Sequence, residues 1–110
     1  MSFSITIQLS QGAFDSALRF YPNPTKNASS VNIDFTLTVP SVVTIEIFDI
    51  LGEKVYSENY GSLAAGSVSK TWALVNSGGA KVGSGLYLVR IKAAGTTNTI
   101  ETTKKLVVIR

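Results

Sequence analysis

The sequence has no cysteine and no histidine among its 110 residues. Without cysteine no disulfide framework can form, and without either residue the usual ligand sets for zinc and copper are missing. Catalytic arrangements in which an imidazole activates a serine or a cysteine are excluded as well. The seven carboxylates are scattered singly along the chain. We therefore expect no enzyme, no metal site and no cofactor in this sequence.

Charge is also sparse. The formal net charge is +3, and among the basic residues only Lys104 and Lys105 are adjacent. Nucleic-acid-binding surfaces need a clustered basic footprint, usually with stacking aromatic rings, so no nucleic-acid partner is expected. No apolar run approaches the roughly eighteen residues that cross a bilayer. The first ten residues lack the basic leader and apolar core of a signal peptide, which places any export signal upstream of them.

What the sequence does contain is a regular alternation of apolar and polar residues. Residues 3–9, 31–39 and 43–47 all follow it, and β-branched residues are frequent. Because successive strand residues face opposite sides, each run offers one apolar face to a core. A hydrophobic content of 45% with 15% charged residues fits one packed domain of this length.

Turn signals separate the alternating runs about every ten residues. They are Pro40-Ser41, Leu51-Gly52-Glu53, Ala64-Ala65-Gly66, the glycine-rich residues 76–85, and Ala94-Gly95-Thr96. They predict strands at about residues 2–9, 18–21, 31–39, 42–49, 54–60, 67–74, 86–93 and 98–109. The pattern indicates an all-β sandwich of two sheets. The glycine-rich residues lead into a strand and not into a helix, so we interpret them as a flexible connection and not as a phosphate-binding loop.

Three aromatic side chains require a choice between a core and a surface role. Trp72 has the strand parity of Val68 and Leu74, which favours the core over a sugar-stacking platform. Tyr56 and Tyr60 share one face of their strand and are candidates for stacking on a sugar or a partner protein. Half-exposed strand tyrosines are nevertheless common without any ligand.

Short motifs follow one another in an order that is more specific than the fold. They are FYPNPTKN (20–27), VTIEIFDILGEKV (43–55), LAAGSVSKTWAL (63–74), GSGLYLVRI (83–91) and KKLVVIR (104–110). In this order and spacing they resemble the C-terminal sorting domain of the type IX secretion system, the exporter of many Bacteroidetes-type bacteria. The resemblance covers about residues 18–110. The same pattern is similar to the immunoglobulin-like domain of flagellar hook-capping proteins.

The resemblance implies an immunoglobulin-like antiparallel β-sandwich of about seven strands that acts as a sorting signal and not as an enzyme. In that family the domain follows a secreted cargo, which is the upstream domain of the same chain, and folds in the periplasm. An outer-membrane translocon recognises it, and a sortase-like peptidase typically removes it at the cell surface. The implied sorting signal lies in the last two strands, at Gly85, Tyr87, Val89, Lys104, Lys105, Leu106, Val107, Val108, Ile109 and Arg110.

Two of these segments also allow a physical interpretation. Tyr21, Pro22, Asn23 and Pro24 form a rigid entry corner, because the prolines fix two φ angles and remove two backbone donors. At a sheet edge, residues 104–110 would leave backbone groups available to a partner by strand addition, with basic flanks for an acidic groove. The alternatives are an ordinary corner and an ordinary last strand. Gly85 is expected to allow a sharp turn into its strand.

Residues 1–17 precede the usual start of the family, and we interpret them as a linker or as an extra N-terminal strand from the upstream region. Residues 18–110 form the predicted sandwich. A lone strand cannot bury its apolar face, so residues 2–9 should pair with this sandwich, with the upstream domain, or with a neighbouring molecule. The last case would give a strand-swapped dimer in vitro.

Three functions therefore compete. The first is a non-catalytic domain that directs export of a cargo through the periplasm to the cell surface or medium. The second is a carbohydrate-binding or adhesion module, with Tyr56, Tyr60 or Trp72 as exposed platforms. The third is a structural piece like the hook-cap domain.

Overall fold

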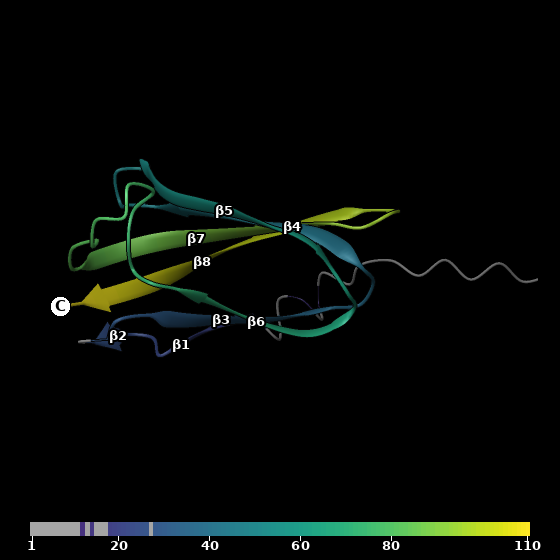
Figure 1. The fold of residues 1–110 in the computed structure, drawn as a ribbon, viewed down its shortest axis with the longest axis horizontal. Helices are drawn as coiled ribbons and strands as arrows, with labels where there is room; N and C mark the ends of the chain where they lie inside the picture. The colour runs from purple at the N-terminus through teal and green to yellow at the C-terminus, as the bar shows by residue number, and fades with distance from the viewer. Residues whose placement is uncertain (1–11, 13, 15–17, 27) are drawn as a thin grey trace, which may run out of the picture.

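The computed structural model describes residues 12, 14, 18–26 and 28–110. Its strands form two sheets packed face to face (Figure 1). The smaller sheet has the order β1-β3-β6, with β1 (Arg19–Tyr21), β3 (Val31–Leu37) and β6 (Gly66–Trp72). The larger sheet has the order β2-β8-β7-β4-β5, with β2 (Thr25–Lys26), β8 (Thr99–Ile109), β7 (Gly85–Ala94), β4 (Ser41–Phe48) and β5 (Lys54–Leu63). The predicted all-β immunoglobulin-like sandwich is confirmed.

The predicted strands from residue 18 onward are all present, and their ends differ from the predicted ends by at most a few residues. The predicted strand at residues 2–9 lies outside the described residues. β2 was not predicted, because two residues are too short to show an alternation. It pairs with β8 in parallel, whereas the other strand pairings of the two sheets are antiparallel as predicted. No helix among the described residues is long and apolar enough to cross a membrane.

The core lies between the sheets and is built from the alternating residues that the sequence indicated. On β3, β4 and β7 every second side chain is buried. Trp72 is 2% exposed, and its ring packs 6.1 Å from Tyr87 and 6.0 Å from Tyr56 between centroids. Its core position is confirmed. Phe14, which precedes the predicted start of the sandwich, is fully buried and packs 5.5 Å from Phe35.

Consecutive strands lie in different sheets at five connections, which are β1–β2, β2–β3, β3–β4, β5–β6 and β6–β7. The entry corner makes the first of them and carries the chain from β1 in the smaller sheet to β2 in the larger. β4 and β5 are joined within the larger sheet by a tight turn. Asp49 Oδ1 accepts the backbone N–H groups of Leu51 and Glu53, and Gly52 has a φ of 85° that favours glycine.

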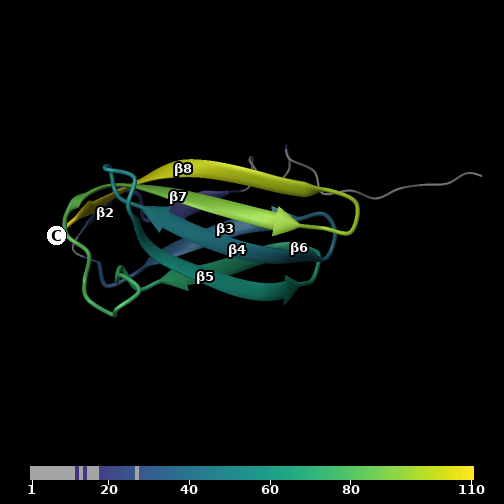
Figure 2. The same cartoon turned by 90° about the horizontal axis from the view of Figure 1, so that it is seen from above.

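The β4–β5 turn lies at the same end of the sandwich as the last residues of β8. Phe48, at the end of β4, pairs with Leu88, which pairs in turn with Lys105. Figures 1 and 2 show this turn near the carboxyl end of the chain and the start of β7. The motifs at residues 43–55, 83–91 and 104–110 are thus brought together at one end of the sandwich.

Candidate functional site

The last strand is built into the larger sheet. β8 pairs with β7 along its length, from Thr99 opposite Ala94 to Val108 opposite Gly85. On its other side, β2 pairs Thr25 with Val108 and Lys26 with Ile109. The end of β8 therefore has strand partners on both sides.

Asn23 of the entry corner extends this coverage by two residues. Its Nδ2 donates to the carbonyl of Lys105 at 3.3 Å, and its Oδ1 accepts the N–H of Val107 at 3.2 Å. A side-chain amide carries a donor and an acceptor side by side, so it replaces the peptide group of a neighbouring strand. The prediction that residues 104–110 leave their outer backbone groups open is wrong for residues 105–109, because the entry corner and β2 occupy that edge.

The basic residues of the terminal segment make structural bonds. Lys104 Nζ donates to the carbonyl of Leu18 at 2.8 Å, close to where the sandwich begins. The guanidinium of Arg110 donates to the carbonyls of Val82 at 2.8 Å and Leu74 at 3.0 Å. Leu74 has a φ of 57°, which is unfavourable for a leucine, so Arg110 supports a strained part of the connecting loop. Of the three basic residues, Lys105 is the one that projects outward in register with Leu88.

The predicted signal residues divide into an inward and an outward group. Leu106 and Val108 are 0% and 1% exposed and belong to the core, as do Tyr87 and Val89. Their neighbours Lys105, Val107 and Ile109 face outward. The outward group is the part of this set that is accessible at the surface of the folded domain.

Tyr87 fixes the start of β7 by a polar contact. Its hydroxyl donates to the carbonyl of Gly83 at 2.8 Å. Burial raises the pKa of Tyr87, the carboxylate of Asp49 raises it further, and Arg110 lowers it. The hydroxyl therefore stays protonated and keeps its donor across the physiological range.

Gly85 begins β7 without an unusual backbone conformation. Its φ lies outside the left-handed region, and the nearest atom to an added Cβ would be Cε2 of Tyr87 at 4.0 Å. The prediction that a glycine is needed here for a sharp turn is wrong. An alanine fits this position without strain.

Charged side chains occupy the middle of the outer face of the larger sheet. Glu46 pairs with Lys54 at 2.9 Å, and Arg90 pairs with Glu101 at 2.7 Å. The hydrogen bond from Lys54 lowers the pKa of Glu46, with smaller contributions from the charges of Lys54, Arg90 and Lys92 and against a cost of burial. These pairs form a solvated, nearly neutral band between the two ends of the sheet.

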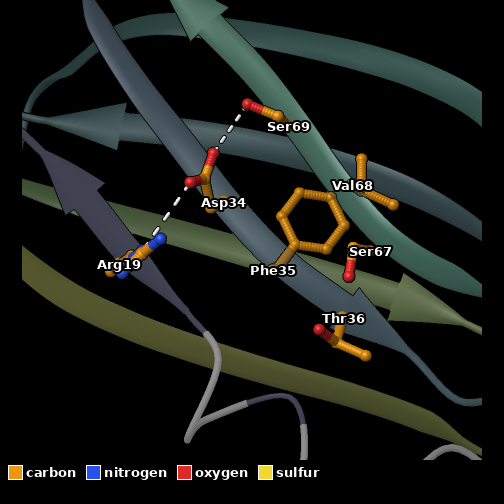
Figure 3. Close-up of a pocket in the computed structure, with 7 residues that line it drawn as sticks. All are labelled: Arg19, Asp34, Phe35, Thr36, Ser67, Val68 and Ser69. Carbon is orange, nitrogen blue, oxygen red and sulfur yellow. Dashed lines mark hydrogen bonds and ion pairs between the residues drawn. The ribbon is translucent and has the colours of Figure 1, made fainter.

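The outer face of the smaller sheet carries a shallow polar groove of about 360 Å³. Figure 3 shows Asp34 between Arg19 and Ser69. The carboxylate accepts the Ser69 hydroxyl at 2.6 Å and lies 3.7 Å from Arg19. The acidic and basic groups neutralise each other, and the groove has the composition of a solvated strand face.

Within residues 12, 14, 18–26 and 28–110, no three histidine, cysteine, aspartate or glutamate residues lie together as a ligand set.

The proposed sugar platforms are poorly exposed. Trp72 is buried, so the interpretation of this residue as a platform is wrong. Lys70 Nζ lies 5.2 Å from the centroid of the Tyr60 ring. Burial is the main cause that raises the pKa of Tyr60, and the charge of Glu58 raises it further. Tyr56 packs against Trp72. These rings are occupied by intramolecular contacts.

Replacing Asn23 with alanine is expected to lower the free energy of unfolding by about 1 kcal/mol, because two backbone groups of β8 lose their partner. The amide hydrogen of Val107 should also exchange faster. Urea unfolding and NMR-detected exchange measure the two effects. Asn32→Ala is the matched control, since that amide accepts a longer 3.4 Å bond from Thr71 within the smaller sheet and does not contact β8. An unchanged exchange rate at Val107 would show that Asn23 does not hold β8.

The model of the FlgD Ig-like domain matches residues 20–97, which is well over half of the sequence. The chain belongs to the FlgD Ig-like domain family. The predicted relation to hook-capping immunoglobulin-like domains is therefore confirmed. No curated protein matches the sequence at a significant level.

Solved structures share the fold. Dimeric latent PorU from Porphyromonas gingivalis is 23% identical with a TM-score of 0.71, over 84% of this chain and 9% of that one. FlgD from P. aeruginosa is 24% identical with a TM-score of 0.63, over 82% of this chain and 72% of that one. PorZ, a surface component of the type IX secretion system of Porphyromonas gingivalis, is 21% identical with a TM-score of 0.62, over 91% of this chain and 12% of that one. The chain thus spans a small part of PorU and PorZ.

Proposed function

We propose that this FlgD-like domain is a non-catalytic sorting domain for type IX secretion, which directs an upstream cargo across the outer membrane to the cell surface. The observation that carries the proposal is the construction of the last strand. Its inward residues Leu106 and Val108 are core, while Lys105, Val107 and Ile109 face outward. The implied signal is therefore a surface of the folded domain.

The comparisons support this proposal in two ways. The fold is shared with PorZ and PorU, and in both proteins the matching part is a small share of a much longer chain. A domain that accompanies a larger protein suits a role as a sorting signal. Residues 1–17 would then lead to the cargo, and residues 18–110 would be the domain that the translocon recognises and that a sortase-like peptidase separates from the cargo.

The entry corner gives the proposal a mechanism. The first residues of the sandwich contact the last strand through Lys104 to Leu18, Asn23 to Lys105 and Val107, and β2 to Val108 and Ile109. The segment nearest the cargo is thus held to the sorting strand. An outward surface in this region forms when both ends of the domain have folded together, so that export follows folding of the complete domain.

Fusion to a reporter tests the function. The whole chain is placed after a fluorescent reporter with a signal peptide, in a bacterium that has the type IX exporter. The reporter is expected at the cell surface or in the medium, and it should remain periplasmic in a matched strain without the translocon. Retention of the reporter in the periplasm of the competent strain would overturn the proposal. Cell fractionation and surface protease accessibility provide the measurement.

A further inference from the structure

The outer face of the larger sheet is apolar at one end. Outward side chains meet there in register, with Phe48 beside Leu88 and Leu86 beside Val107. Ile109 follows on β8 and is 39% exposed. In the adjoining β4–β5 turn, Ile50 and Leu51 are 72% and 83% exposed. We name this surface the apolar patch and define it by Phe48, Ile50, Leu51, Leu86, Leu88, Val107 and Ile109.

The patch contrasts with the other outward surfaces of the sandwich. The middle of the same sheet carries the ion pairs of Glu46 and Arg90. The smaller sheet presents Asp34 bonded to Ser69 and Asn32 bonded to Thr71. Scattered exposed aliphatic residues are normal, but a contiguous cluster of them marks an interaction site. Ile50 and Leu51, exposed at the tip of the turn, enlarge this cluster.

We propose that the apolar patch docks on a protein of the export machinery whose aliphatic surface is bordered by acidic side chains. The inference deepens the proposed sorting function and rests on it. Two exposed lysines give the charge preference. Lys105 lies beside Leu88, and Lys26 lies beside Ile109 on the same outward face. Acidic groups of a partner would meet these lysines when the aliphatic side chains make contact.

Two other occupants fit the patch less well. An anionic lipid surface is negative throughout, so it would meet Asp49 and Glu53 beside the exposed pair Ile50 and Leu51 and be repelled there. A protein partner can instead place its acidic groups opposite Lys26 and Lys105 and keep them away from this turn. A second copy of the chain would bring the same patch of both molecules together around a two-fold axis. The lysines of both copies would then border one interface, with like charges close to one another.

The proposal also gives the last strand a way to take part in recognition although its edge is covered. Backbone groups of residues 105–109 are bonded to β7, β2 and Asn23. Recognition by strand addition would require those bonds to break. Contact through the side chains of Lys105, Val107 and Ile109 leaves the sandwich intact.

Charge substitution in the turn tests the patch. The reporter fusion is compared with the double variant Ile50→Asp/Leu51→Asp and with Val42→Asp. Val42 is the matched control, because it is 44% exposed on the same outer face but at the opposite end of β4. We expect the double variant to lower the exported reporter about tenfold or more, and the control to export like the wild type. Both variants should unfold at nearly the same temperature as the wild type, since neither site is in the core.

A photo-crosslinking amino acid at position 51 identifies the occupant in exporting cells. An adduct with an outer-membrane protein at position 51, absent at position 42, is expected alongside the export defect. Normal export of Ile50→Asp/Leu51→Asp, with wild-type export still dependent on the translocon, would overturn the patch and leave the sorting function standing. Failure of the wild-type fusion would overturn both.

Two solution measurements report on the other occupants. Purified full chain is analysed by light scattering, and its binding to vesicles of phosphatidylethanolamine and phosphatidylglycerol is measured by sedimentation. A monomer that does not bind the vesicles is expected. A dimer, or vesicle binding, that Ile50→Asp/Leu51→Asp abolishes and Val42→Asp does not would overturn the assignment to a protein partner.

Discussion

Removing residues 106–110 is expected to unfold the domain. The truncation deletes Leu106 and Val108, which are 0% and 1% exposed, together with their pairing to β7. It also removes the strand partner of β2 and the bonds of Arg110 to Leu74 and Val82. A buried leucine reduced to alanine costs about 2–5 kcal/mol by itself. The combined loss is comparable to the total stability of a small domain, about 5–15 kcal/mol.

Urea unfolding followed by circular dichroism measures this effect on the full and the truncated chain. Ile109→Ala is the matched control within the deleted segment, because Ile109 is 39% exposed and its truncation should cost less than about 1 kcal/mol. A truncated chain that unfolds at the same urea concentration as the full chain would contradict the packing described here. If the chain does unfold, loss of export on deletion cannot separate a missing signal from a missing fold. Outward-facing substitutions such as those at Ile50 and Leu51 avoid that ambiguity.

Alternation in the sequence was sufficient to predict the layered fold. Side-chain direction in a strand repeats every two residues, so the burial of residues such as Ile33 and Ile45 follows from the order of the residues alone. Residues 106–109 are all apolar, so the structure and not the sequence shows that Leu106 and Val108 face the core while Val107 faces outward. Trp72 was placed in the core by the same rule. Turn chemistry located the β4–β5 turn, where Gly52 adopts the positive φ that a glycine permits.

The contacts that cover the last strand could not be predicted from local pattern. Asn23 and Val107 are separated by 84 positions, and β2 is two residues long. Neither a single amide nor a two-residue strand leaves a periodic signal. The role of the basic residues at the two ends of residues 104–110 could not be decided from the sequence either. Lys104 and Arg110 looked like charges for a partner, yet their donors bind backbone carbonyls of this chain.

The apolar patch required the fold to bring its parts together. Phe48, Leu86 and Val107 belong to three separate motifs, and their adjacency depends on the order β8-β7-β4 in the larger sheet. Sequence alone indicated a turn at Leu51 but gave no reason for two exposed aliphatic residues there. Their exposure is informative because the same turn could have been formed by polar residues.

We propose that the sorting signal is a surface of the folded domain and not a linear peptide. Residues 106–110 obtain their positions from β7, β2 and the entry corner, none of which a peptide carries. A reporter bearing residues 104–110 alone should therefore lose export almost completely.

Surface display of two periplasmic reporters tests this claim most directly, one with residues 104–110 attached and one with the whole chain. The whole chain is expected to bring its reporter to the cell surface, while the peptide is expected to leave its reporter in the periplasm. Equal display of both reporters would contradict it.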